Sequence, residues 1–353
     1  MRARELGIAI GRLSPGPANA ITDVAGVRVG QTTIVRGEDV RTGVTVVVPH
    51  EGDPGRDPVF AGCHRLNGNG EVTGLEWLRE SGMLTTPIGI TNTHSVGVVR
   101  DAIVSAGPLE VGRWSLPVVG ETYDGFLNDI NGQHVRAEDV HEALRTAATG
   151  PVPEGCVGGG TVMICHGFKG GTGTSSRVVA EEAGGFAVGV LVQANHGRRP
   201  RFRVNGVAVG ERIGADVVAL PSSGGGEGAG SIIVVIATDA PLLPGQCGRL
   251  AQRAMLGVGR TGGMGEHSSG DFAVCFATGN RGLSAEKGER RQLLYEVTML
   301  SHVELDALFE AVIDATEEAI LNALLAAETT TGRAGNVVHA LPPRLLQTAL
   351  EGA

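Results

Sequence analysis

The sequence contains few aromatic residues and lacks the long apolar runs of a membrane protein. Aromatic side chains make up 3% of the 353 residues, so a core must consist mainly of Val, Ile, Leu and Ala. No segment approaches the roughly 18 uninterrupted apolar residues of a transmembrane helix. The first residues also lack the apolar stretch of a secretory signal peptide. We therefore expect a soluble, cytoplasmic protein with no membrane partner.

Several nucleotide-binding, hydrolase and metal-binding motifs are also missing. Neither of the two lysines, Lys169 and Lys287, lies in a GxxxxGK[ST] loop, so the sequence has no P-loop. No GxGxxG opens a helix, no GxSxG marks an α/β-hydrolase nucleophile, and no HExxH is present. None of the ten histidines has metal-ligand spacing with acidic partners. We expect neither a metal nor an organic cofactor.

Charge and cysteine content argue against two further classes of protein. The 29 basic residues are outnumbered by 38 acidic ones, for a formal net charge of −9, and the basic residues are scattered. A nucleic-acid-binding protein needs a basic face to displace counterions, so we expect no nucleic acid partner. The five cysteines are widely spaced and form no CxxC. This pattern is typical of buried thiols in a reducing compartment.

Glycine, by contrast, is abundant, at 56 of 353 residues against a usual fraction of roughly 7%. Apolar runs of strand length alternate loosely with amphipathic helical patterns, and no break in composition suggests a second domain. The sequence therefore predicts one layered α/β domain over residues 1–353. We expect strands near 44–49, 87–92, 116–120, 161–164, 187–194, 231–237 and 272–277, and helices near 71–80, 96–105, 138–148, 245–256, 302–329 and 344–350.

The most distinctive segment is a run of small residues that ends directly before a strand. Residues 221–230 (PSSGGGEGAG) contain no aliphatic side chain larger than proline, which is typical of an exposed flexible loop. Residues 231–237 (SIIVVIA) give the strongest β-strand pattern in the chain. Such a loop is unusual at a domain boundary and natural at a processing site between Gly230 and Ser231.

Cleavage between Gly230 and Ser231 would give Ser231 a chemistry that an internal serine lacks. A serine hydroxyl is a poor nucleophile without an adjacent base. The new α-amino group, with a pKa of about 7.7–8.0 before burial, would supply that base at short range. The same hydroxyl can attack the Gly230 carbonyl, and glycine permits the strained backbone that this step needs. The alternative, which the pattern alone favours, is a surface loop leading into a strand that happens to begin with serine.

Ordered motifs along nearly the whole chain resemble the self-processing peptidases of the L-aminopeptidase D-amidase/D-esterase and β-peptidyl aminopeptidase family. They lie at residues 19–30 (NAITDVAGVRVG), 41–45 (RTGVT), 67–71 (NGNGE), 91–101 (TNTHSVGVVRD), 167–177 (GFKGGTGTSSR), 193–195 (QAN), 230–232 (GSI) and 269–271 (SGD). The resemblance implies a four-layer αββα sandwich, similar to N-terminal-nucleophile hydrolases but differently connected. It also implies autoproteolysis between Gly230 and Ser231 into chains 1–230 and 231–353, which stay associated.

The resemblance implies roles for three residues at the start of the new chain and beyond it. Ser231 matches the nucleophile that cleavage exposes. Ser269 and Asp271 match a pair that orients or activates this nucleophile. Members of the family that cleave β-peptides carry Glu where this chain has Asp271, which leaves the details of the relay open. Ser268 is adjacent to Ser269, but the Ser-Gly-Asp spacing fits the motif better.

Three further residues match the oxyanion side and the amine side of the family's pocket. Tyr123 and Asn195 match the groups that stabilise the oxyanion, and Glu121 matches the carboxylate that receives the substrate's free ammonium. Glu121 and Tyr123 follow a predicted strand, where residues i and i+2 share a face, so both can point into one pocket. Without the resemblance, a solvated strand end, a packing residue and a turn former are the simpler interpretations. Residues 167–177 are expected to form a structural or pocket-shaping loop.

The implied activity is that of an aminopeptidase or amidase. It would hydrolyse the amide or ester bond after a free-amino N-terminal residue of short peptides, amides or esters, through an acyl-enzyme on Ser231. The general base and the preference among L-, D- and β-amino acids stay open. Relatives form larger assemblies, so we expect a homo-oligomer of cleaved heterodimers. The alternatives are a self-processing acyltransferase similar to ornithine acetyltransferases, which expose threonine, and an uncleaved, non-enzymatic binding protein.

Overall fold

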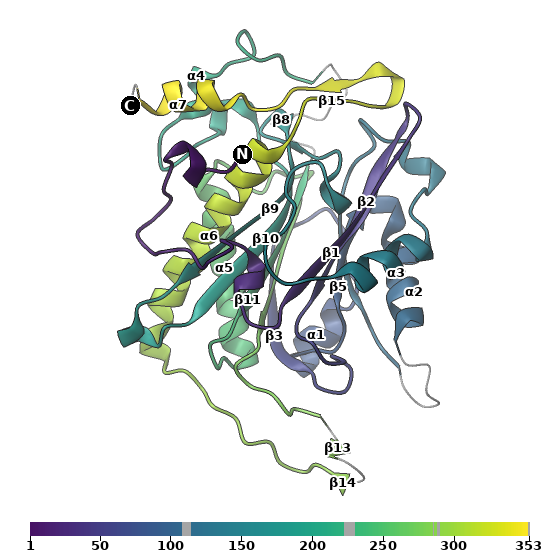
Figure 1. The fold of residues 1–353 in the computed structure, drawn as a ribbon, viewed down its shortest axis with the longest axis vertical. Coiled ribbons are helices and arrows are strands. Elements are labelled where there is room, and N and C mark those ends of the chain that lie inside the picture. The colour runs from purple at the N-terminus through teal and green to yellow at the C-terminus, as the bar shows by residue number, and fades with distance from the viewer. Residues whose placement is uncertain (108–113, 222–229, 285, 288–289, 352–353) are drawn as a thin grey trace.

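Two β-sheets lie face to face, and helices cover their outer surfaces (Figure 1). The structure is a computed structural model that describes residues 1–107, 114–221, 230–284, 286–287 and 290–351. The flexible loop expected before Ser231 lies almost entirely outside the described residues. Among the described helices, none has the length and apolar character needed to cross a membrane.

The smaller sheet has four strands in the order β1-β2-β5-β6. These are β1 (Arg28–Arg36), β2 (Val40–Val48), β5 (Ile88–Asn92) and β6 (Val118–Thr122). Strands β5 and β6 are parallel, and the other neighbours are antiparallel. Helices α2 (Val96–Ala106) and α3 (Ala137–Thr146) cover the outer face.

The larger sheet has six strands in the order β4-β3-β12-β11-β10-β9. These are β3 (Val59–Gly68), β4 (Met83–Leu84), β9 (Gly171–Val178), β10 (Ala187–Asn195), β11 (Ser231–Thr238) and β12 (Gly270–Ala277). Strands β11 and β12 at its centre are parallel. Helices α5 (Pro244–Arg260) and α6 (Leu305–Ala326) pack on its outer face.

The remaining elements are short. They are α1 (Leu75–Ser81), α4 (Val209–Arg212), α7 (Pro343–Glu351), β7 (Ile164–Cys165), β8 (Phe168–Lys169), β13 (Glu286–Lys287), β14 (Arg290–Arg291), β15 (Thr330–Thr331) and β16 (Val337–Val338). Single-turn 3₁₀ helices lie at Arg4–Leu6, Ile21–Asp23, Thr93–Ser95, Ile130–Gly132, Gly158–Gly160, Glu181–Ala183, Arg199–Arg201, His302–Glu304 and Arg333–Gly335.

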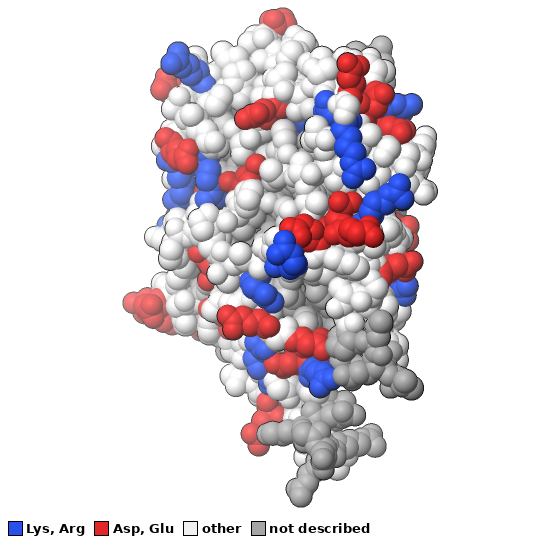
Figure 2. Space-filling view, turned by 45° about the vertical axis from the view of Figure 1, so that its right-hand side comes forward, with Lys and Arg blue, Asp and Glu red and all other residues white. Residues whose placement is uncertain are grey.

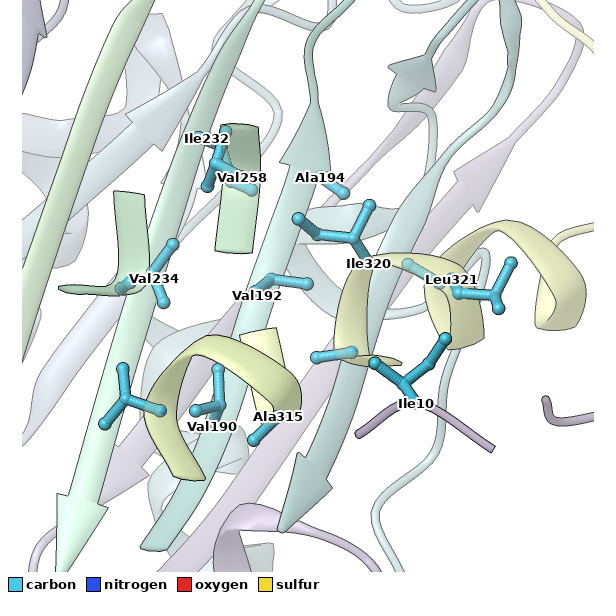
Figure 3. Close-up of a cluster of buried hydrophobic side chains, with 14 of the residues drawn as sticks. Ile10, Val190, Val192, Ala194, Ile232, Val234, Val258, Ala315, Ile320 and Leu321 are labelled. Atoms are coloured by element: carbon cyan, nitrogen blue, oxygen red, sulfur yellow. The ribbon is translucent and has the colours of Figure 1, made fainter. Parts of the chain in front are cut away.

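Strand β11 connects the two largest parts of the core because both of its faces are apolar. Its even-numbered side chains, Ile232 and Val234 among them, pack with α5 and α6 (Figure 3). Its odd-numbered side chains, such as Ile233 and Val235, lie between the two sheets. Full burial of such a side chain contributes roughly 1.5–3 kcal/mol. The strand that begins with Ser231 is therefore anchored from both sides.

Most of the expected elements are confirmed, but the strand expected over residues 161–164 is wrong. Gly158–Gly160 form a 3₁₀ helix, residues 161–162 continue it as a turn, and only Ile164 and Cys165 pair, with β8. A Cβ on Gly160 would lie 2.2 Å from the backbone nitrogen of Thr172. At Gly160 the backbone therefore packs directly against the backbone of Thr172, with no side chain between them. Residues 167–177 were expected to form a loop, but they largely form β8 and β9.

Acidic and basic side chains are mixed on the molecular surface. On the face drawn in Figure 2, neither sign gathers into a large continuous patch. This face therefore offers no basic surface of the kind that a nucleic acid requires.

Candidate active site

A pocket of about 530 Å³ lies where β6, β10 and β11 reach the same end of the molecule. Four of the six residues singled out in the sequence line it: Glu121, Tyr123, Asn195 and Ser231. Ser269 and Asp271 are buried on either side of Gly270 and are not among the residues that line the pocket. The other lining residues are Asn69, Gly70, Glu71, Thr93, Asp124, Phe126, Val162, Ile164 and Ser268.

Ser231 is held at the floor of this pocket by the strands on both sides of it. It is buried and lies opposite Asn195 in the antiparallel pairing of β10 with β11. Its Oγ accepts a hydrogen bond of 3.1 Å from the backbone N–H of Gly270. This bond fixes the oxygen and leaves its own proton available for donation.

Gly230 packs so closely against β10 that no other residue fits. A Cβ at this position would lie 1.8 Å from the backbone oxygen of Asn195. Since the obstructing atom belongs to the backbone of a central strand, it cannot rotate away. The glycine before Ser231 is therefore required by packing, in addition to any chemical role.

Ser269 and Asp271 form a hydrogen-bonded pair beside the nucleophile. The Ser269 hydroxyl donates to Asp271 Oδ1 at 2.6 Å. Burial raises the pKa of Asp271 to about 6, against the opposing effect of the Ser269 hydrogen bond, and the nearby charge of Glu266 raises it further. Asp271 Oδ2 is buried and has no hydrogen-bond partner among the described residues. The pair can therefore take up a proton within the ordinary range of enzyme pH.

Glu121, at the end of β6, is a buried carboxylate held by two donors. Its Oε1 accepts the backbone N–H of Glu71 at 3.0 Å, and its Oε2 accepts the hydroxyl of Thr93. Burial raises the pKa of Glu121, and the two hydrogen bonds oppose this shift. A bound ammonium would stabilise the charged carboxylate, so this group is suited to bind a free N-terminus.

Tyr123 and Asn195 both line the pocket and contact each other through a hydrogen bond. The Asn195 side-chain nitrogen donates to the backbone oxygen of Tyr123 at 3.1 Å, and Asn195 Oδ1 accepts the N–H of Ile164 at 2.7 Å. These bonds fix which way the amide points and leave one N–H unused. The Tyr123 side chain is about half exposed. Glu121 and Tyr123 both line this pocket.

Sequence reasoning missed Asp124, a buried carboxylate next to Tyr123. Its Oδ2 accepts hydrogen bonds from the side chains of Thr42, Asn92 and Asn128, at 2.8, 3.0 and 3.0 Å. Burial raises its pKa to about 6. These three donors lie far apart in the chain, so no local spacing could have revealed the cluster. Asp124 fixes the end of the strand that carries Glu121.

One group of side chains has the composition of a metal site, which the sequence spacing did not suggest. Ligand atoms of Cys165, His166 and His196 lie within 4.8 Å of one another, and all three residues are buried. The His166 ring stacks on Phe202, with 4.8 Å between centroids, and burial lowers the pKa of both histidines. The nearby guanidinium of Arg199 also lowers the pKa of His166. A divalent cation would add charge to an already cationic, buried place, so these residues fit a packing cluster better.

Known proteins resemble this chain over nearly its whole length. Residues 19–338 match peptidase family S58. The beta-peptidyl aminopeptidase BapA of Sphingosinicella microcystinivorans is 49% identical over 369 aligned residues, which cover 99% of this chain and 92% of the relative. A protein of the same name from Sphingosinicella xenopeptidilytica is 43% identical, covering 97% of this chain and 89% of the relative.

Two solved structures share the whole fold. A beta-aminopeptidase from a Burkholderia species has a TM-score of 0.92 and 54% identity, with 100% of this chain and 99% of that chain covered. The L-aminopeptidase D-Ala-esterase/amidase of Ochrobactrum anthropi, described as a prototype of the serine aminopeptidases and a variant of the Ntn hydrolase fold, has a TM-score of 0.89 and 42% identity, with 99% and 98% covered. The expected fold class is thereby confirmed, and this chain belongs to the serine aminopeptidases of peptidase family S58.

Proposed function

We propose that this chain cleaves itself before Ser231 and then removes N-terminal residues, including β-amino acids, from short peptides, amides or esters. The observation that carries the proposal is the shared pocket of Ser231, Glu121, Tyr123 and Asn195. In this proposal Ser231 is the nucleophile, Glu121 is the carboxylate that binds the ammonium, and Tyr123 and Asn195 are the two hydrogen-bond donors. The names of the relatives at 49% and 54% identity favour β-aminoacyl substrates.

The self-cleavage step uses the close contact between Gly230 and β10. Ser231 Oγ attacks the Gly230 carbonyl carbon, the carbon–nitrogen bond between the residues breaks, and the hydroxyl proton passes to the departing nitrogen. Water then hydrolyses the resulting ester. This step leaves a carboxylate on Gly230 and restores the hydroxyl of Ser231, which now also carries a free α-amine.

The two chains remain one folded unit because strands of the second chain lie between strands of the first in the larger sheet. Strands β11 and β12 of chain 231–353 lie between β3 and β10 of chain 1–230. Separation of the chains would break the pairing on both sides and expose apolar core residues. We expect the cleaved heterodimer to be the working form.

Substrate turnover repeats the attack with a bound peptide in place of Gly230. The free ammonium lies at Glu121, and Ser231 Oγ attacks the first carbonyl carbon. Its proton goes to the α-amine of Ser231, or through Ser269 to Asp271. The Tyr123 hydroxyl and the Asn195 amide stabilise the oxyanion, where loss of one donor typically slows such reactions by about 10²–10³-fold. The leaving amine takes a proton, and water hydrolyses the acyl-enzyme.

We also propose that cleaved units assemble into a cytoplasmic homo-oligomer. Large apolar side chains are exposed on the segment that precedes α6, below the body of the molecule in Figure 1. Leu293, Leu294 and Val303 are each more than three-quarters exposed. Apolar surface of this kind is typical of a contact between protein chains. A second copy of this chain would cover it.

Mass spectrometry of the purified wild type and of Ser231→Ala tests the proposal. We expect two wild-type chains, the second beginning Ser-Ile-Ile, and an intact variant. The wild type should hydrolyse β-homoalanyl and L-alanyl p-nitroanilide, and the variant neither. An uncleaved, inactive wild type would contradict the proposal and favour the alternative of a non-enzymatic binding protein. Faster transfer to an added amine than to water would indicate an acyltransferase instead.

A further inference from the structure

The catalytic pocket carries an excess of negative charge. Its lining includes three acidic side chains, those of Glu71, Glu121 and Asp124, and none of the lining residues within the described part of the chain is Lys, Arg or His. A substrate with a single ammonium group would neutralise only one of these acids. The pocket therefore has capacity for a second positive charge.

The three acids differ in how their oxygens are already occupied. The Asp124 and Glu121 carboxyl groups are buried and accept hydrogen bonds from protein donors. Glu71 is exposed, and its carboxylate has no ion pair or hydrogen bond among the described residues, since only its backbone N–H is engaged. Glu71 is thus the acid in the pocket that is free to meet a ligand.

The backbone of Glu71 is fixed beside the carboxylate that would bind the substrate's amine. Its backbone N–H donates to Glu121 Oε1 at 3.0 Å. The Cα that carries the Glu71 side chain is therefore next to the carboxylate that would bind the ammonium. The negative charge of Glu71 also acts on Glu121, whose protonated form it favours. The two side chains therefore sit within electrostatic range of one substrate residue.

We propose that Glu71 is a specificity residue, which binds a basic side chain on the N-terminal residue of the substrate. The inference rests on the proposed function, because it takes the substrate's ammonium to lie at Glu121. The favoured substrates are peptides or amides that begin with a lysine-like residue, in the α- or the β-amino acid series. Neutral side chains are accepted with lower efficiency, and acidic side chains are repelled.

A matched pair of substrates isolates this contact. Norleucine keeps the four-carbon side chain of lysine and lacks only the ammonium group. We expect the wild type to cleave lysyl p-nitroanilide with a kcat/KM roughly 3–10-fold above that of the norleucyl compound at low salt, as for a partly enclosed ion pair. The preference should shrink at about 0.5 M salt, where exposed charges are screened.

Two variants assign the preference to one residue. Glu71→Gln should bring the lysyl-to-norleucyl ratio to about 1. Glu76→Gln is the matched control, because Glu76 lies five residues further on and is ion-paired with Arg79. It lines a neighbouring cavity that Glu71 also borders, but not the catalytic pocket. It should keep the wild-type ratio. Equal rates on both substrates in the wild type, or a preference that survives in Glu71→Gln, would overturn the assignment.

A binding measurement separates this inference from the proposed function. L-Lysinol and L-norleucinol carry the amine and the side chain but no bond to cleave, so calorimetry can compare their affinities for the wild type. Tighter binding of lysinol that Glu71→Gln removes supports the basic subsite even if no amide is hydrolysed. Hydrolysis without any difference between the two amino alcohols or the two anilides would refute the subsite and leave the aminopeptidase standing.

Discussion

Gly230 matters for both packing and cleavage, because both depend on the position of its backbone. A Cβ there would lie 1.8 Å from the Asn195 oxygen and 3.1 Å from the Cα of His196. In Gly230→Ala the segment must move away from β10, which shifts the carbonyl that Ser231 attacks. A misplacement of about 1 Å can slow a reaction by about 100-fold, so we expect at least that loss in self-cleavage.

The amount of intact chain over time, measured by mass spectrometry, gives the cleavage rate of Gly230→Ala. Gly245→Ala is the control, because Gly245 lies in α5 and a Cβ there meets no atom within 4 Å. It should be processed at the wild-type rate. Normal processing of Gly230→Ala would show that the scissile carbonyl tolerates displacement.

Asp271 should set the acidic limb of the pH profile. Burial raises its pKa to about 6, and only the ionised carboxylate can accept a proton. Below about pH 6 the rate of the processed enzyme should therefore fall, by up to tenfold per pH unit. In Asp271→Asn the rate should be lower and this limb should be lost or shifted, as measured by kcat against pH.

Asp239→Asn provides the comparison for Asp271→Asn. Burial also raises the pKa of Asp239, but this residue lies just beyond the far end of β11 and bonds the backbone N–H of Ala187. Its substitution should leave the pH profile of kcat in place. An acidic limb that stays unchanged in Asp271→Asn would assign the titration to another group, such as Glu121.

Sequence reasoning singled out four residues that line one pocket, but it missed residues that hold or adjoin them. Glu121 and Tyr123 share the pocket as strand alternation predicted, and Asn195 lies opposite Ser231. Asp124 and Glu71 were missed because their importance depends on contacts with residues distant in the chain. Such contacts leave no periodic signal, and only the assembled sheets bring them together.

At the level of elements, prediction succeeded where apolar side chains carry the packing. Strand β11 was identified because residues 232–237 are all apolar, which suits a strand buried on both faces. Strand β9 was missed because its sequence, GTGTSSRV, is small and polar. Its burial depends on close approach of α6, where a Cβ on Gly173 would lie 2.0 Å from the Ala319 oxygen. Hydropathy cannot report packing of this kind.

Polar contacts also replace apolar ones along β9. Ser175 Oγ and the N–H of Ser176 donate to Asn19 Oδ1, each at 3.0 Å. The adjacent Arg177 is buried and forms a 2.7 Å ion pair with Glu318 of α6. The motif around residues 167–177 is therefore structural, as expected, but it acts as a strand rather than a loop.

Across the whole molecule, Glu318 links the two chains that cleavage would produce. This carboxylate belongs to chain 231–353, and it meets Arg177, Arg4 and Asn19 of chain 1–230, at 2.7, 3.1 and 2.6 Å. Its side chain is fully buried. Loss of one partner from a buried ion pair typically costs about 3–5 kcal/mol, because the other charge stays buried without compensation.

Glu318→Gln should therefore lower the free energy of unfolding by about 3–5 kcal/mol. Glu310→Gln is the matched control, because Glu310 also joins α6 to the N-terminal segment, through Arg12, but in a largely exposed pair. It should cost less than about 1 kcal/mol. Denaturant unfolding of both variants in the uncleaved Ser231→Ala background keeps the reaction unimolecular. If the two variants unfold alike, the buried carboxylate does not hold the chains together, and strand pairing alone must do so.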